Sequence, residues 1–128
     1  IKKGVVDVIT CNHQPHENEI REVEFPIAPM GCIGTQIAFP MALTYLLDEL
    51  DLETIVKTMS INPRTILQTD IPVIKEGFVA NLTLFDTHTE WKFDKSSNSS
   101  LSENTPMLDS TLKGKVHGTI LGNYLHFS

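Results

Sequence analysis

The sequence predicts a fold of the α/β class, and three features of its pattern support this. Residues 4–11 (GVVDVITC) are a short apolar run rich in β-branched residues, residues 36–67 have helical periodicity, and strand-like segments follow from about residue 71. An apolar strand followed by helices is typical of a βα unit, and a β-rich tail adds a second kind of structure. We therefore expect helices packed with a sheet.

Length and composition limit the class of protein. The 128 residues suffice for one small domain, and 41% hydrophobic and 20% charged residues are typical of soluble globular proteins. A net charge of −6 argues against nucleic acid and anionic membranes as partners. No apolar run approaches a bilayer span, and Cys11 and Cys32 form no disulfide framework, so we expect a reduced, cytoplasmic protein.

The first element is predicted to be a strand over residues 4–11. Its apolar side chains, among them Val5, Val6 and Val8, lie on both faces, as in the strands of parallel sheets. Such a strand needs neighbouring strands, and the sequence offers none beside it. Since the chain also begins with Ile1 and not with methionine, we expect an upstream part of a longer protein to supply the sheet.

Residues 12–35 predict a long loop because prolines and glycines recur in them, and loops of this length are usually functional or mobile. A helix over about 36–50 follows, with Pro40 near its first turn. Asp51 predicts the N-cap of a second helix of about eight residues, and Asn62, followed by a proline, predicts the start of a third.

The last part of the chain predicts strands joined by polar turns. Residues 94–105 are serine-rich and indicate an exposed loop, and Gly122-Asn123 indicates a two-residue hairpin. The expected strands are residues 79–85, 90–93, 115–121 and 124–127.

Chemistry-bearing residues gather just after the first strand, in the run Asn12-His13-Gln14-Pro15-His16. Catalytic groups of α/β barrels lie on the loops that follow the carboxyl ends of strands, so Asn12, His13 and His16 are placed as metal or substrate ligands would be. A plain alternative is that these polar residues cap a helix or bond to the backbone.

The run from Asp7 to His16 resembles the pattern D-x-(I/L)-x-(S/T)-D-H-(A/Q)-P-H of the dihydroorotases, cyclic amidohydrolases that carry it at the end of barrel strand eight. The resemblance continues in order to about residue 125. It includes APMGCIG at 28–34, NPRTIL at 62–67, GFVANLTLFD at 77–86, NTPM at 104–107 and LKGKV at 112–116.

The resemblance implies a more specific fold. The chain would be the C-terminal part of a (β/α)8 metal-dependent hydrolase barrel together with β-strands of a small composite β-sandwich. Residues 1–70 would be the last βα unit, with strand eight and the C-terminal helices of the barrel. Residues 71–128 would be the C-terminal strands of the β-sandwich subdomain.

The resemblance also implies an activity: reversible, zinc-dependent hydrolysis of the cyclic amide of dihydroorotate to carbamoyl aspartate in pyrimidine biosynthesis, with one or two zinc ions. The family has an aspartate at the end of strand eight that binds metal and moves the proton, and this sequence has Asn12 there. A neutral amide is at best a weak metal ligand and no useful base near neutral pH. A nearby carboxylate, Glu17 or Glu19, is an alternative proton acceptor. The other metal ligands of the family lie upstream, so the chain alone is expected to be inactive.

Substrate-binding residues carry over too. His16 matches the histidine that bonds the carboxylate of the substrate, and Met30 and Gly31 would present backbone groups to the ring. Glycine allows such close approach, although turn geometry alone would also explain Gly31. For His13 we expect a structural role, with its ring bonded to a backbone carbonyl.

Two functions follow from the resemblance. The chain is part of a true dihydroorotase, or part of a non-catalytic paralogue that acts as a scaffold for another enzyme of the pathway. Asn12 favours the scaffold, whereas His16 and the loop at 28–34 favour the enzyme. A third function, an independent binding module, is disfavoured because the first strand lacks partners. For the full-length protein we expect dihydroorotate as small-molecule substrate and a homodimer or a pathway-enzyme complex.

Overall fold

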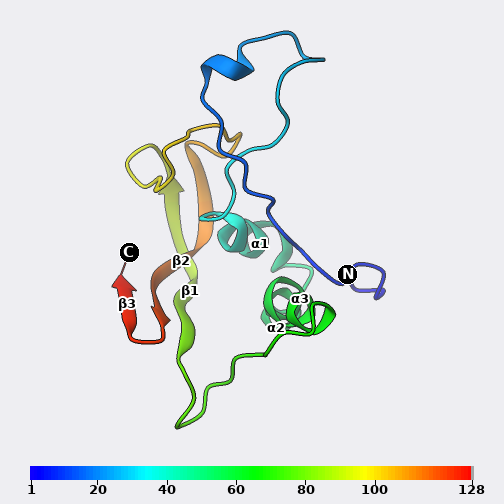
Figure 1. The fold of residues 1–128 in the computed structure, drawn as a ribbon, viewed down its shortest axis with the longest axis vertical. Coiled ribbons are helices and arrows are strands. Elements are labelled where there is room, and N and C mark those ends of the chain that lie inside the picture. The colour runs from blue at the N-terminus through cyan, green and yellow to red at the C-terminus, as the bar shows by residue number, and fades with distance from the viewer. Residues whose placement is uncertain (128) are drawn as a thin grey trace.

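The computed structural model describes residues 1–127. It confirms the α/β class, with a layer of helices against an antiparallel sheet of strand order β1-β2-β3 (Figure 1). The elements in chain order are η1 (Glu19–Arg21), α1 (Ala38–Leu46), α2 (Leu52–Val56), the π-helical η2 (Lys57–Ile61), α3 (Asn62–Ile66), β1 (Asn81–Phe93), β2 (Ser110–Leu121) and β3 (Tyr124–Phe127).

The helices and the sheet share their core. Ile33 and Ile37, just before α1, pack with Phe93 of β1 and Leu112 of β2, and all four side chains are buried. A second buried cluster lies between α1 and α2. It contains Ala42, Leu43, Leu50 and Ile55. The apolar positions of the helical segment are therefore buried, in part against the strands and in part between the two helices.

Helix α1 lies directly on β2. The Oγ1 of Thr44 accepts a hydrogen bond from the backbone N–H of Lys113 at 2.8 Å. Next to it, Gly114 has a φ of +86°, and a Cβ built there would collide with Leu43. Two features therefore require a glycine at this position: its backbone conformation and its contact with the helix.

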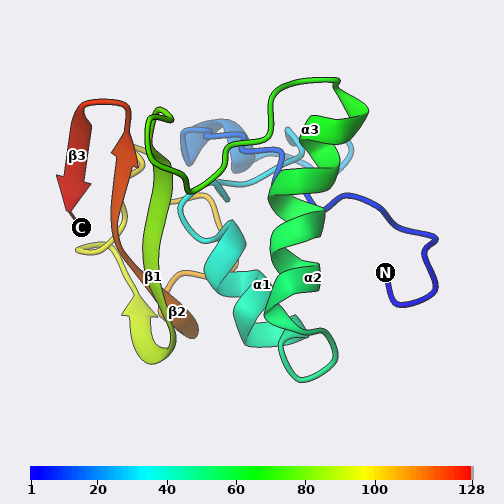
Figure 2. The same ribbon diagram turned by 90° about the horizontal axis from the view of Figure 1, so that it is seen from below.

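The second helix is longer than expected. Asp51 caps it as predicted, accepting a hydrogen bond from the backbone N–H of Thr54 at 2.6 Å. An α-helical segment, α3, begins at Asn62 as predicted, but it is not a separate helix, because α2, η2 and α3 run on as one helical rod (Figure 2). Asn62 has helical dihedrals, and its side chain donates to the carbonyl of Asp7 instead of capping. The wide π-turns of η2 relieve the crowding that Pro63 would cause in a regular α-helix.

The strands also differ in length from the prediction. The two expected segments merge into the single strand β1, which begins at Asn81 and not at residue 79, and in which the register with β2 shifts between Asp86 and Glu90. There the carboxylate of Asp86 accepts from the backbone N–H groups of His88 and Thr89, which satisfies donors that the ladder leaves free. The predicted hairpin is confirmed, since Leu121 pairs with Tyr124.

The predicted strand over residues 4–11 is absent from the structure. The backbone there is held by two contacts to the helical rod, from Ile9 N–H to the carbonyl of Thr58 and from Asn62 to the carbonyl of Asp7. No strand within residues 1–127 lies beside it, and an extended segment forms a β-ladder only with a partner. The loop predicted at 12–35 is confirmed, apart from the short η1.

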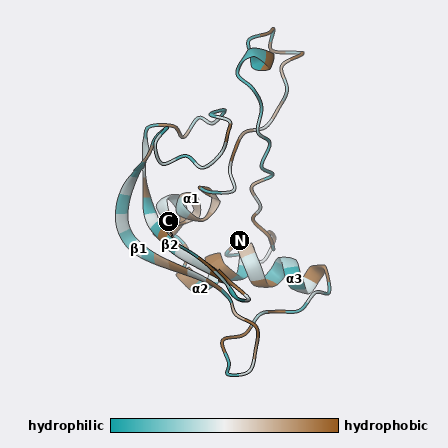
Figure 3. Ribbon diagram, turned by 60° about the vertical axis from the view of Figure 1, so that its left-hand side comes forward, coloured by the Kyte–Doolittle hydropathy of each residue, from teal (hydrophilic) through white to brown (hydrophobic). Residues whose placement is uncertain are grey.

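Apolar side chains remain exposed in the segment between α3 and β1. Figure 3 shows apolar stretches along this connection. Ile74, Phe78 and Val79 are all exposed there. Among residues 1–127 no helix has the length and apolar character needed to cross a membrane.

Candidate functional site

The predicted site residues lie on two segments that run side by side. The backbone N–H of Gln14 donates to the carbonyl of Cys32 at 2.9 Å, which joins the segment at 12–16 to the segment at 30–35. Both segments precede α1, and the second leads directly into it. The chain therefore brings His16 to the loop that contains Met30 and Gly31.

His13 has a structural contact of a different kind from the predicted one. Its Nδ1 accepts hydrogen bonds from the backbone N–H groups of Gly34 and Thr35, at 3.1 and 3.3 Å. The expectation of a bond to a carbonyl is wrong. The groups next to the ring are backbone N–H donors that precede α1 and therefore have no partner within the helix. Nδ1 must be unprotonated to accept these bonds, so a neutral ring carries its proton on Nε2.

His16 and Met30 meet, as expected of two residues of one binding loop. Nε2 of His16 lies 3.3 Å from the carbonyl oxygen of Met30, and the His16 side chain is half-buried while Met30 is exposed. If the ring donates to this carbonyl, Nδ1 is left as a hydrogen-bond acceptor in the neutral form, and as a donor when the ring is protonated.

Gly31 is required by its position. Its φ is +107°, and a Cβ there would come within 2.8 Å of the Cβ of Gln14. Gly34 is less constrained, since its φ is not left-handed, but a Cβ there would lie 3.1 Å from the Cβ of Cys11, closer than most side-chain contacts. Both glycines permit the close approach of the two loop segments.

The two segments are tied together by Asn104, a residue to which sequence reasoning gave no role in the site. Its side chain is 5% exposed and donates to the carbonyl oxygens of Gln14 at 3.0 Å and Gly31 at 3.4 Å. Its Oδ1 accepts from the backbone N–H of His16 at 3.4 Å and from the hydroxyl of Ser102 at 2.6 Å. The one signal in the sequence was the match at NTPM, which says nothing about contacts.

Asn12 is exposed and has a φ of +41°. This left-handed conformation is unfavourable for most side chains, but asparagine and aspartate both adopt it readily. The backbone therefore accepts either residue at this position. The side chain can offer a carbonyl oxygen and two N–H donors but cannot take up a proton near neutral pH.

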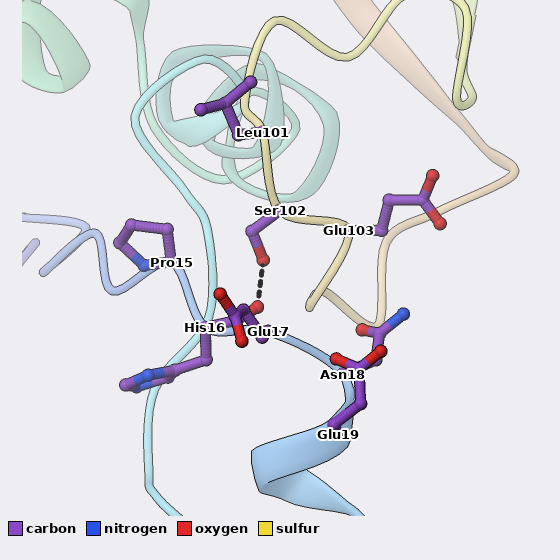
Figure 4. A pocket seen from close by; sticks show the side chains of 8 residues that line it. All are labelled: Pro15, His16, Glu17, Asn18, Glu19, Leu101, Ser102 and Glu103. Carbon is purple, nitrogen blue, oxygen red and sulfur yellow. Dashed lines mark hydrogen bonds between the residues drawn. The ribbon is translucent and has the colours of Figure 1, made fainter.

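A hollow of about 550 Å³ lies beside His16, between the loop at 15–19 and the loop at 101–103. Figure 4 shows its lining, with the Ser102 hydroxyl bonded to the His16 carbonyl and the imidazole pointing away from Glu103. Three carboxylates, those of Glu17, Glu19 and Glu103, belong to this lining. The hollow is therefore unsuited to an anion, and it does not include Asn12.

The described residues do not assemble a metal centre. Within 1–127 no three histidine, cysteine or acidic side chains come together as a metal ion would require. His88 lies on β1, His117 on β2 and His126 on β3, and all three are exposed. Asn12 alone does not fit zinc, which takes three or four protein ligands.

Comparison with known proteins supports the predicted resemblance. No family model matches the chain. The chain is similar to the dihydroorotase of Ruminiclostridium cellulolyticum, with 37% identity over 95% of the chain and 29% of the relative. It is similar also to the dihydroorotase of Aquifex aeolicus, with 38% identity over 94% of the chain and 28% of the relative. The chain thus spans less than a third of the length of the curated relatives it matches.

Solved structures show the same fold in proteins of low sequence identity. The L-hydantoinase of Arthrobacter aurescens matches with a TM-score of 0.83 and 24% identity, over 96% of this chain and 29% of that one. The D-hydantoinase of a Thermus species matches with a TM-score of 0.84 and 16% identity, over 98% of this chain and 30% of that one. The inactive dihydroorotase-like domain of a multifunctional protein from Chaetomium thermophilum matches with a TM-score of 0.57 and 18% identity. The match covers 73% of this chain and 25% of that one.

Proposed function

Because the chain belongs to the dihydroorotase family of cyclic amidohydrolases, we propose that it is the C-terminal segment of a dihydroorotase. The reaction is the reversible hydrolysis of the cyclic amide of dihydroorotate to carbamoyl aspartate, a step of pyrimidine biosynthesis. In the full-length protein, this segment would contribute the loop that holds the substrate. The segment by itself would be inactive.

One observation carries this proposal: the chain folds so that Nε2 of His16 lies 3.3 Å from the Met30 carbonyl, beside Gly31. These are the three residues that the family resemblance assigns to the substrate. A protonated imidazole is a strong partner for a carboxylate, and backbone groups at a glycine approach a flat ring closely. Dihydroorotate has a ring of this kind, with one carboxylate.

Zinc is the metal that the resemblance implies, and the described residues do not supply a site for it. We therefore assign the ligands to the part of the relatives' length that this chain does not span. Asn12 would lie beside that metal as a weak ligand or a hydrogen-bond partner. The residues of this chain would bind and orient the substrate.

Asn12 supports the alternative, a non-catalytic paralogue that acts as a scaffold. Ring opening needs a group at this position that takes a proton and gives it to the leaving nitrogen, which an ionised carboxylate does and an amide does not. A domain of related fold bears the description of an inactive dihydroorotase-like domain, so this fold occurs without activity. Glu17 and Glu19 are poor substitutes, because they line a hollow to which Asn12 does not belong.

The rest of the proposal concerns the full-length protein. Residues 1–70 would complete the barrel with strand eight and its helices, and residues 71–128 would add strands to the β-sandwich. The protein would be cytoplasmic and act as a homodimer or within a complex of pathway enzymes.

The experiment is to measure zinc content and dihydroorotate hydrolysis of the full-length protein, with Asn12 and with Asn12→Asp. Zinc together with turnover in the aspartate form supports the enzyme. Absence of zinc and of turnover in both forms supports the scaffold. Full turnover with Asn12 in place would contradict the requirement for a carboxylate at this position.

A further inference from the structure

The side chain of Asn104 has every hydrogen-bonding capacity used. A primary amide offers two N–H donors and one oxygen with two lone pairs. Here the donors go to the carbonyls of Gln14 and Gly31, and the oxygen receives the Ser102 hydroxyl and the N–H of His16. The residue is buried, so water does not replace these partners.

Two of these four bonds go to backbone groups at His16 and just before it. Asn104 bonds the N–H of His16 and the carbonyl two residues before it. The Ser102 hydroxyl lies 2.5 Å from the carbonyl oxygen of His16 and 2.6 Å from Oδ1 of Asn104, and it shares its single proton between these two acceptors. The backbone on both sides of His16 is thereby fixed by residues that follow it by 86 and 88 positions in the chain.

The same amide holds the facing loop. It bonds the carbonyl of Gly31, which follows Met30, the residue that His16 contacts through Nε2. The backbone carbonyl of Asn104 also accepts from the N–H of Ile33 at 3.1 Å. Loss of this side chain would free both loop segments at once, and the contact between Nε2 of His16 and the Met30 carbonyl would no longer be held in place.

From this geometry we infer that Asn104 is a positioning residue, which with Ser102 holds His16 and Gly31 in the arrangement that receives the ring of the substrate. The inference rests on the proposed function. A residue with only a packing role would lower stability when removed but leave substrate affinity unchanged. A positioning residue changes affinity as well, because the ligands of the substrate lose their geometry.

The test uses the full-length protein with Asn12→Asp as background and compares Asn104→Ala, Ser102→Ala and Gln36→Ala. Gln36 is the matched control, since its amide also bridges backbone groups, donating to the carbonyl of Ser97 and accepting from the N–H of Ser99, but does not touch the His16 loop. Ser102→Ala is the milder variant in case Asn104→Ala does not fold, because it removes one hydroxyl and leaves the Asn104 side chain in place.

We expect Asn104→Ala to raise KM for dihydroorotate by about 10- to 100-fold, the usual effect of removing an outer support of a site, with a smaller change in kcat. Ser102→Ala should act in the same direction by a smaller factor, and Gln36→Ala should leave KM unchanged. Hydrogen exchange of the amides of Gln14, His16 and residues 31–33 should become faster in the first two variants only.

A KM within about twofold of the background for Asn104→Ala, with folding intact, would overturn the inference and leave the proposed function standing. Unchanged exchange at the amides of Gln14 and His16 would overturn it as well. Failure of the background protein to turn over dihydroorotate would overturn the proposed function first, and the positioning role with it.

Discussion

Gly114 and Leu43 lie so close together that a single added methyl group at position 114 would overlap the Leu43 side chain. This contact sets the distance between α1 and β2, and α1 follows directly on the loop that carries Met30 and Gly31. The packing of the sheet on the helix therefore fixes one side of the candidate site.

Gly114→Ala should destabilise the protein by at least about 2 kcal/mol, since the left-handed φ and the overlap with Leu43 both oppose the new side chain. Urea unfolding of the full-length protein measures the change. Gly77→Ala is the control, because Gly77 has a φ of +83° but nothing within 4 Å of the new Cβ. Equal losses from the two variants would show that the contact with Leu43 is unimportant.

His13→Ala should loosen the turn before α1, because the backbone N–H groups of Gly34 and Thr35 lose their acceptor, at a cost of roughly 1 kcal/mol. Their amide hydrogen exchange should become faster. His13→Asn should restore part of the protection, since its Oδ1 can stand near the position of Nδ1. Equal exchange in both variants would contradict a role for Nδ1 as acceptor.

Asp51 should give helix α2 a dependence on pH. The N–H of Thr54 donates to its carboxylate and lowers the pKa of Asp51 below the ordinary value of 3.8. The stabilisation is therefore fully present above that value and is lost as the pH falls through the lowered pKa.

Asp51→Asn keeps an oxygen acceptor at every pH. As the pH falls from about 5 to about 2.5, the unsubstituted protein loses the contribution of its carboxylate, so the difference between the melting temperatures of the two proteins should narrow. Asp48→Asn, an exposed position outside the cap, is the charge-matched control. A gap between Asp51→Asn and the unsubstituted protein that stays constant over this range would contradict the assignment.

The amides of residues 4–11 should exchange at different rates in the isolated chain and in the full-length protein. In the isolated chain the amides of Val6 and Val8 should exchange quickly, because no strand within residues 1–127 pairs with them. In the full-length protein we expect a parallel strand and slow exchange at the same amides. Slow exchange of both amides in the isolated chain would contradict the need for outside strands.

Local chemistry predicted much of the fold correctly. The cap at Asp51 and the turn at Gly122 depend on residues a few positions apart, and the structure has both. The continuation of the helix through Asn62 was not predictable in this way, because the side chain has a partner, Asp7, that lies 55 residues away. Tertiary contacts of this kind override local signals.

The same limit applies to the site. The sequence indicated His16, Met30 and Gly31 through neighbouring motif positions, and the structure brings these together. The role of Asn104 in supporting the site was not predicted, because its partners Gln14 and Gly31 lie 90 and 73 residues away along the sequence. Periodicity and motif spacing contain no information about a hydrogen bond of that range.

The most direct test of the account is the rate of dihydroorotate hydrolysis by the full-length protein with Asn12→Asp, relative to the protein with Asn12. Both residues fit the left-handed backbone at position 12, so the exchange alters the proton chemistry and not the fold. We predict a gain of at least about 100-fold, the usual contribution of a general acid–base group. Equal rates in the two forms, or no hydrolysis and no zinc in either, would contradict the account.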